Sequence, residues 1–216
     1  MAIRSIGVIP DGTRRWAARE GISLPCSYAH AFKNLTKHID ALSKRGVRHI
    51  HVYMFSLYNL KRIRDEIDAC LDAECEFIDN LVAREIPIAV YGDIEAMRDA
   101  HARIAEIMER LRYVQHPEGD ATTVHLYIGY SFENHLRALL AGKREISSIV
   151  ESLAAERIDL LIRTGGASTL SDFLPIHSRY AQLHFLPALF NDFTVRELIS
   201  ICEQHDAASK AYKYGE

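Results

Sequence analysis

The sequence predicts an α/β fold with a central, mainly parallel β-sheet of about six strands flanked by helices. Three observations lead to this prediction. Short β-rich runs alternate with longer amphipathic runs along all 216 residues, and such alternation is typical of parallel sheets. Several of the β-rich runs are apolar almost throughout, as strands covered on both faces are. No repeat, linker or low-complexity tract divides the chain, so residues 1–216 are expected to form a single domain.

Six segments have the composition of strands. They are residues 3–9, 47–55, 86–92, 123–129, 158–164 and a shorter one at 182–186.

Three segments between these strands carry apolar residues at helical spacing, namely 29–46, 65–85 and 93–111. Gly46 is suited to end the first helix, and Asp93 is suited to cap the third. A further helix is expected to begin directly after the first strand.

Composition excludes several classes of protein. The chain has 26 basic and 29 acidic residues, and a net charge of −3 does not favour a nucleic-acid-binding protein. Charged residues make up 25% and hydrophobic residues 48%, which is typical of a folded domain rather than a disordered one. No apolar run approaches the roughly 18 residues that span a bilayer, so no integral membrane segment is expected. The first residues lack the pattern of a signal peptide, and we expect a cytoplasmic protein.

Cysteine and histidine give weaker signals. The four cysteines form no CxxC pair, and we interpret them as small buried apolar residues; they are Cys26, Cys70, Cys75 and Cys202. Eleven histidines first suggest metal ligands. His49 and His51 share one face of a predicted strand, but two ligands do not make a site, so we interpret most histidines as packing or surface residues.

Ligands of parallel sheets bind beyond the carboxyl ends of the strands. The first strand is followed by PDGTRRW, residues 10–16. Asp11 could simply be the N-cap of the next helix. Alternatively, Gly12, the helix N-terminus, Arg14 and Arg15 hold an anion, and a divalent metal joins Asp11 to a diphosphate.

The fifth strand ends in Arg163, followed by Gly165 and Gly166 and then by the hydroxyls of Thr169 and Ser171. This pattern resembles a phosphate cradle, although it is neither a Walker loop nor GxGxxG. The alternative is a plain strand–helix turn with an exposed arginine.

The second strand ends with Ser56 and Asn59, and Arg62 follows. A lone Ser–Asn pair is usually a cap or a turn. Polar residues after three strands nevertheless predict two anionic groups bound near each other. No GxSxG elbow for a serine nucleophile is present.

Together these segments resemble the cis-prenyltransferase family, the undecaprenyl-diphosphate-synthase-like fold. Its first signature corresponds to residues 11–17, its second to 53–62 and its third to 159–185. Residues 191–193 and 213–215 echo later family segments. The resemblance covers nearly the whole chain in the right order.

This resemblance implies an enzyme that ionises an allylic diphosphate in an apolar substrate cavity walled by the 65–85 helix. The double bond of a second prenyl diphosphate then attacks the carbocation. It also implies Mg²⁺ as cofactor and a homodimer. Asp11 matches the essential acid and magnesium partner, and Asn59 matches the position often given the proton-acceptor role. The substrate-binding positions carried over are Gly12, Thr13, Arg14, Arg15, Trp16, Ser56, Tyr58, Arg62, Arg163, Gly165, Gly166, Thr169 and Ser171.

Departures from the family pattern concentrate on the second diphosphate site. Ala167 and Thr169 replace a glutamate and an arginine, and Gln182 replaces a magnesium-binding acid, which puts ordinary head-to-tail elongation in question. The remaining departures are Thr13, Arg14, Leu24, Tyr28, Tyr58 and Leu60.

The PDGxRRW opening and the Gly-Gly-Ala segment are similar to lavandulyl-type members of the family, which join dimethylallyl diphosphate head-to-middle with another allylic diphosphate. That reaction is the leading hypothesis. One alternative is an ordinary head-to-tail short-chain cis-prenyltransferase that uses isopentenyl diphosphate. The other is a non-catalytic partner subunit, against which the retained Asp11, Arg15, Asn59 and Arg163 argue.

Overall fold

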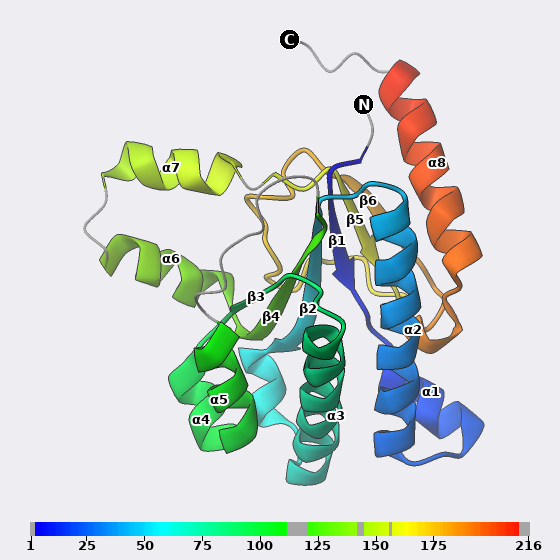
Figure 1. The fold of residues 1–216 in the computed structure, drawn as a ribbon, viewed down its shortest axis with the longest axis vertical. Coiled ribbons are helices and arrows are strands. Elements are labelled where there is room, and N and C mark those ends of the chain that lie inside the picture. Colours follow the sequence, from blue (N-terminus) through cyan, green and yellow to red (C-terminus); the bar gives the residue numbers. More distant parts are fainter. Residues whose placement is uncertain (1–2, 112–120, 142–144, 156, 212–216) are drawn as a thin grey trace.

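The computed structural model describes residues 3–111, 121–141, 145–155 and 157–211. Its centre is a six-stranded sheet in the order β3-β4-β2-β1-β5-β6, in which all neighbouring strands are parallel (Figure 1). This arrangement confirms the predicted fold class. The strands are β1 (Ser5–Ile9), β2 (His49–Ser56), β3 (Ile88–Tyr91), β4 (Thr123–Tyr130), β5 (Leu160–Arg163) and β6 (Gln182–Phe185).

Helices connect most of the strands. The α-helices are α1 (Thr13–Glu20), α2 (Leu24–Lys44), α3 (Arg64–Ala83), α4 (Ile94–Ala100), α5 (Ala102–Leu111), α6 (Phe132–Ala141), α7 (Ile146–Ala155) and α8 (Val195–Ala211). Two 3-10 helices, η1 (Leu57–Lys61) and η2 (Phe190–Asp192), follow β2 and precede α8. No helix of the described residues combines the length and apolarity needed to cross a bilayer.

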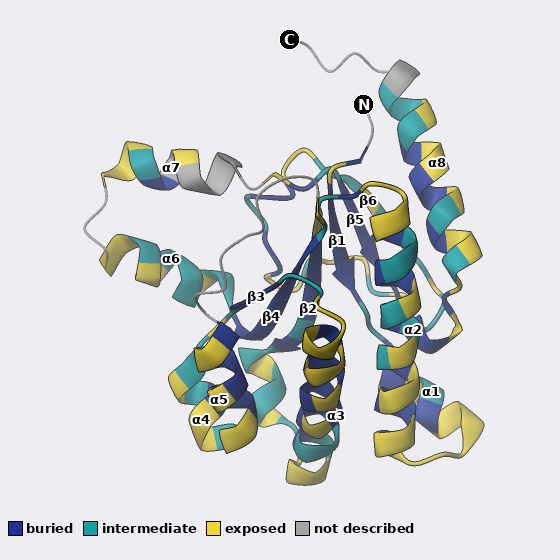
Figure 2. Ribbon diagram, viewed as in Figure 1, coloured by how far each residue is buried: buried dark blue, intermediate teal, exposed yellow. Residues whose placement is uncertain are grey.

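The two faces of the sheet have different chemistry because successive side chains of a strand point to opposite faces. Ile50 and Val52 of β2 join a mainly aliphatic cluster that includes residues of α2, α3, α5 and α8. Tyr53, on the other face, stacks on Phe173, with ring centroids 4.7 Å apart. Most residues of β1 to β5 are buried, as Figure 2 shows, whereas β6 at the edge of the sheet has no buried residue.

Some local predictions were wrong. The single helix expected over 93–111 is broken at His101, whose extended backbone ends α4 and whose Nδ1 accepts a hydrogen bond from the Ile104 amide at the start of α5. Asp93 does cap α4, by accepting from the Ala96 amide. Cys26 is exposed, whereas the other three cysteines are buried as expected.

Helix α6 differs from the other α-helices because none of its residues is buried. Figure 1 shows α6 and α7 extending from the side of the molecule, away from α2 and α8. Leu140 on α6 is 53% exposed, and Ile146 at the start of α7 is 77% exposed.

One ionisable side chain lies inside this mainly aliphatic core. Glu74 of α3 is 0% exposed. The Cys70 thiol donates a hydrogen bond to its Oε1 over 3.5 Å, and Oε2 has no partner among the described residues. Burial raises the pKa of Glu74 from its ordinary 4.5 to about 8. The side chain is therefore a neutral carboxylic acid at pH 7.

Glu74→Gln should change how stability depends on pH. Between about pH 5 and pH 8 the folded protein holds a proton on Glu74 that the unfolded chain has lost, so rising pH lowers the free energy of unfolding. In the wild type this loss of stability amounts to up to about 1.4 kcal/mol for each pH unit, and the glutamine variant lacks it. Urea unfolding at several pH values measures it, and the variant should gain stability relative to the wild type as pH rises.

The matched control is Glu76→Gln, an exposed position on the same helix, which should leave the pH dependence unchanged. A stability difference between Glu74→Gln and the wild type that stays constant with pH would contradict a neutral, buried Glu74.

Candidate functional site

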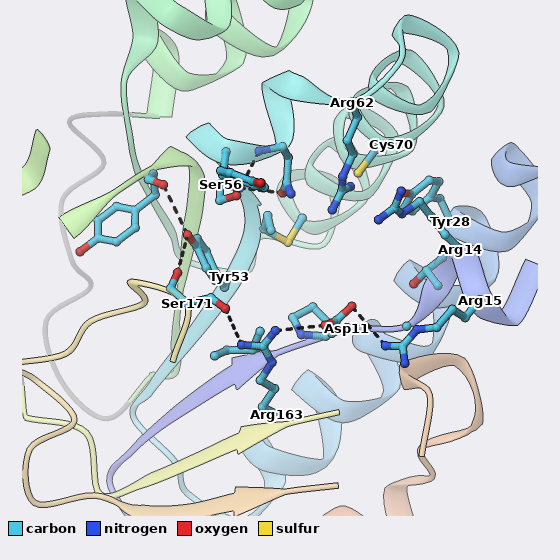
Figure 3. Close-up of a pocket in the computed structure, with 18 of the residues that line it drawn as sticks. Asp11, Arg14, Arg15, Tyr28, Tyr53, Ser56, Arg62, Cys70, Arg163 and Ser171 are labelled. Carbon is cyan, nitrogen blue, oxygen red and sulfur yellow. Dashed lines mark hydrogen bonds and ion pairs between the residues drawn. The ribbon is translucent and has the colours of Figure 1, made fainter. Parts of the chain in front are cut away.

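The three polar strand ends meet because β2, β1 and β5 are neighbours in the sheet. Beyond their carboxyl ends lies a cavity of about 890 Å³. Its wall combines the segments after these strands with side chains of α1, α2 and α3, and Figure 3 shows the principal residues. Of the predicted site residues, those that line the cavity are Asp11, Gly12, Thr13, Arg14, Arg15, Ser56, Tyr58, Asn59, Arg62, Arg163 and Ser171.

Asp11 lies at the centre of this set, between two arginines (Figure 3). Its Oδ2 is 3.1 Å from Nη2 of Arg163, and its Oδ1 is 3.8 Å from Nη2 of Arg15. The carboxylate side chain is still 40% exposed. Asp11 can therefore reach a ligand in the cavity while the arginines keep it oriented.

Arg163 is held from several sides. Its Nη1 donates to the carbonyl of Thr169 over 2.6 Å, to the Thr169 hydroxyl over 3.1 Å and to the Ser171 hydroxyl over 2.6 Å. The residue is 7% exposed, and residues 164–181 form turns and bends rather than a helix. The alternative of an exposed arginine on a strand–helix turn is therefore wrong.

Helix α1 presents its N-terminus to the cavity. The N-cap is Gly12, with φ 115°, and no side chain caps the helix, so the alternative of Asp11 as N-cap is wrong. A Cβ at Gly12 would lie 2.8 Å from the Leu189 side chain, so the close approach and the positive φ both require glycine. The first-turn amides of α1 have no partner within the helix and favour an anion.

The cavity is electropositive. Its lining residues include four arginines and two aspartates. Arg14 is partly neutralised, because its Nη1 lies 2.8 Å from Oε2 of Glu66 on α3. At the rim, Tyr58 is 73% exposed, and Nζ of Lys61 lies 4.6 Å from its ring centroid. The excess of cations fits a ligand with more than one negative charge.

Ser56 and Asn59 have a structural role in addition to their place in the cavity wall. The Ser56 hydroxyl accepts from the Asn59 amide over 3.2 Å, and the Asn59 side chain accepts from the Ser56 amide over 3.0 Å. The pair is a capping box for η1, so the cap interpretation is confirmed. The Asn59 carboxamide oxygen is thus engaged by the backbone of the protein itself.

The amides of Gly165 and Gly166 do not take part in the expected phosphate cradle. The Gly165 amide donates to the Ala188 carbonyl and the Gly166 amide donates to the Leu186 carbonyl, so neither is left for a phosphate. Both glycines have positive φ. A Cβ at Gly165 would lie 2.6 Å from Nη2 of Arg15 and 3.0 Å from the Asp11 carbonyl oxygen. Gly165 thus lets two segments of the site come together, and its carbonyl accepts from Arg15 over 2.7 Å.

Two other predicted binding residues do not line the cavity. Thr169 instead contacts two lining residues, Arg163 and Ser171. Trp16 points elsewhere, because its Nε1 donates to Asp192 over 2.8 Å and its ring stacks on His30. Asp192 also accepts two hydrogen bonds from Arg19, so it fixes α1 to the η2 segment.

Several lining residues were not predicted from their position in the sequence, namely Tyr28, Tyr53, Cys70 and Tyr130. The Tyr53 hydroxyl donates to the Ser171 carbonyl over 3.2 Å, which fixes the loop that also holds Arg163. Burial raises the pKa of Tyr53 to about 12. Strict alternation along β2 does not indicate this residue, because a register shift between Tyr53 and Phe55 places these two side chains in different clusters.

Gln182 lies far from Asp11 within this chain. It opens β6 opposite Leu160, whereas Phe185 pairs with Arg163. Three residues of strand, or roughly 10 Å, separate it from the end of the sheet that carries the cavity. Gln182 therefore does not contribute to a metal site around Asp11 of the same chain. Residues 213–215 of the family-like C-terminal segment lie outside the described residues.

Comparison with known proteins decides the family. The model of the undecaprenyl diphosphate synthase family matches residues 9–213. The chain belongs to this family. An isoprenyl transferase of Campylobacter jejuni is 27% identical over 220 residues, which cover 94% of each chain. A tritrans,polycis-undecaprenyl-diphosphate synthase (geranylgeranyl-diphosphate specific) of Aeropyrum pernix is 27% identical and covers 90% of this chain and 91% of its own. This undecaprenyl diphosphate synthase family member is thus a prenyltransferase, as the sequence predicts.

Solved structures of the family share the fold. Lavandulyl diphosphate synthase from Lavandula x intermedia, in complex with dimethylallyl diphosphate, is 21% identical with a TM-score of 0.73, over 94% of this chain and 95% of that one. The "probable undecaprenyl diphosphate synthase" of Campylobacter jejuni also gives 21% identity and a TM-score of 0.73, over 95% and 96%. The two TM-scores are equal, so backbone similarity does not distinguish head-to-middle from head-to-tail condensation.

The capping box predicts a measurable loss of stability. Ser56→Ala removes the acceptor for the Asn59 amide and should lower the free energy of unfolding by about 1 kcal/mol. Chemical denaturation measures the change. The exposed Ser168→Ala is the control, for which we expect a change below about 0.5 kcal/mol. Equal stabilities of the two variants would mean that the cap contributes nothing.

Proposed function

We propose that this family member condenses two short prenyl diphosphates head-to-middle. The donor is dimethylallyl diphosphate, the acceptor is an allylic diphosphate such as dimethylallyl or geranyl diphosphate, and the product is an irregular lavandulyl-type diphosphate. The observation that carries this proposal is the unequal supply of cations at the two halves of the cavity.

The first half suits the diphosphate that leaves. The free N-terminus of α1, Arg14 and Arg15 surround Gly12 and can hold an anion whose charge grows as the carbon–oxygen bond breaks. The helix dipole and the cations stabilise that charge without rearrangement of the protein. The neighbouring wall from Ile9, Met54 and Tyr130 lacks charge and would keep water from the allylic cation.

The donor set of this half fits Mg²⁺. In proteins Mg²⁺ is commonly held by one or two carboxylates, with phosphate oxygens and water as further ligands. Asp11 offers one carboxylate, 40% exposed toward the cavity and next to the anion site. Among the described residues no cluster of three or more His, Cys, Asp or Glu side chains could hold a metal without a substrate. When bound, Mg²⁺ would neutralise charge on the leaving diphosphate.

The second half offers less positive charge. The loop after β5 contributes Arg163, whose Nη1 is already bonded to Thr169 and Ser171. From residue 164 to residue 174 this loop has no lysine or arginine. A weaker grip here favours an acceptor that is held partly by a longer hydrocarbon chain, such as geranyl diphosphate, over isopentenyl diphosphate.

Product analysis tests the proposed reaction. Purified protein is incubated with Mg²⁺ and dimethylallyl diphosphate, alone, with geranyl diphosphate or with isopentenyl diphosphate, and the dephosphorylated products are identified. We expect branched alcohols from the two allylic mixtures. Only linear cis products, formed only with isopentenyl diphosphate, would exclude the head-to-middle reaction.

Ordinary head-to-tail condensation with isopentenyl diphosphate is the second candidate. Its support is that the curated relatives described above are named isoprenyl transferase and undecaprenyl-diphosphate synthase. Both candidates need the same donor half and differ in the acceptor, so the product analysis separates them.

Asp11→Asn should abolish most of the turnover with the fold intact. Asparagine keeps the shape of the side chain but loses the charge that pairs with Arg163 and would bind Mg²⁺. We expect kcat to fall by about 100-fold or more, with an unchanged circular dichroism spectrum. The control is the exposed Asp99→Asn, which should keep wild-type activity. Full activity of Asp11→Asn would show that the Asp11 carboxylate takes no part in the reaction.

We also propose that the protein is a homodimer, joined through α6 and the start of α7. The support is the exposed apolar surface of Leu140, on a helix that has no buried residue, and of Ile146 at the start of α7. Light scattering should give twice the chain mass. Leu140→Glu should favour the monomer, whereas Val82→Glu on α3, also partly exposed, should not. A wild-type monomer at micromolar concentration would contradict this proposal.

A further inference from the structure

Helices α2 and α3 form the wall of the cavity that lies away from Ser171 (Figure 3). Tyr28 of α2 and Cys70 of α3 are the residues of these helices that line it. One helical turn beyond Cys70, on the same side of α3, is the buried Glu74. One turn beyond Tyr28, Phe32 stacks on Phe77 of α3, with ring centroids 5.1 Å apart.

The side chains between these helices therefore differ in polarity with their distance from the cavity. The outer layer, Tyr28 and Cys70, faces the cavity. The next layer contains the buried Glu74 carboxyl group, and Phe32 and Phe77 stack on each other between the same two helices. An ordinary helix–helix contact would carry an aliphatic residue at position 74, because an unsatisfied buried polar group lowers stability.

We propose that the Glu74 carboxyl, linked to the Cys70 thiol, is a polar stop that ends the hydrocarbon part of the cavity and limits the length of the prenyl chain that binds. This proposal rests on the proposed function, because it assumes that the ligand is a prenyl diphosphate whose chain extends between α2 and α3 while its diphosphate stays near Asp11.

A chain long enough to extend between α2 and α3 passes Tyr28 and Cys70 and separates the Cys70 thiol from Oε1 of Glu74. Oε2 already lacks a partner among the described residues, so the carboxyl group would then lie against hydrocarbon with no hydrogen bond at all. A short chain ends before this layer and leaves the thiol–carboxyl contact intact.

Chain-length selectivity of binding tests the proposal. The ligands are the non-reactive thiolodiphosphate analogues of dimethylallyl, geranyl and farnesyl diphosphate, and calorimetry measures their affinities for the full chain. In Glu74→Ala the affinity for the farnesyl analogue relative to the dimethylallyl analogue should rise by about tenfold or more, because additional methylene groups become buried. Glu74→Gln, which keeps the volume and the polarity, should keep the wild-type ratio.

Two further variants complete the test. Glu74→Leu fills most of the space without a polar group, so it folds even if the alanine variant does not, and it should shift the ratio in the same direction. Glu76→Ala, at an exposed position on the same helix, should leave the ratio unchanged. A wild-type ratio in a folded Glu74→Ala or Glu74→Leu protein would overturn the proposal.

The binding measurement separates this proposal from the proposed reaction. A shifted ratio in a protein that forms only linear products would support the polar stop and reject head-to-middle condensation. If none of the three analogues binds the wild type, the prenyl diphosphate assignment fails and the polar stop fails with it.

Discussion

The position of Asp11 depends on how the ends of β1 and β5 are joined. Ile9 pairs with Arg163 in the parallel ladder, so the residues that follow each strand emerge side by side. The Thr164 hydroxyl accepts from the Asp11 amide and lies 2.9 Å from the Asp11 carbonyl oxygen, which fixes the backbone on both sides of the carboxylate. Gly165 then allows the segment after β5 to approach the segment after β1, since any Cβ at Gly165 would meet Asp11 and Arg15. The ion pair between Asp11 and Arg163 follows from this register.

Some hydrogen-bond donors around the cavity are bonded within the protein, and others are available to a ligand. The backbone amides of Gly165, Gly166 and Asn59 are committed to the protein itself. The N-terminus of α1 is not, because no side chain caps it. An anion is therefore expected at the α1 end, where donors are free, and the loop after β5 serves first to position Arg163.

Much of the fold followed from the sequence because period-two and helical patterns are local properties. All six strands lie inside or within one residue of the predicted segments, and residues 10–16 do lead into a helix at the cavity. What the sequence did not determine was the partner of each polar group. The Gly-Gly pattern is the same whether its amides point at a phosphate or at Ala188 and Leu186, and the difference depends on a chain segment about twenty residues away. Tyr28 and Cys70 were missed for the same reason, since only the packing of α2 on α3 brings them to the cavity.

The immobility of Arg163 has a consequence for the thermodynamics of binding. A long cationic side chain normally loses about 2 kcal/mol of rotamer entropy when a ligand fixes it. Arg163 has already lost that freedom during folding, through its contacts with Thr169 and Ser171, whereas Arg15 is 58% exposed along its side chain. Anions of equal charge would thus meet a preorganised partner at one end of the cavity and an adaptable one at the other. Binding of an anion at the Arg163 end and binding at the Arg15 end should differ more in entropy than in the number of contacts formed.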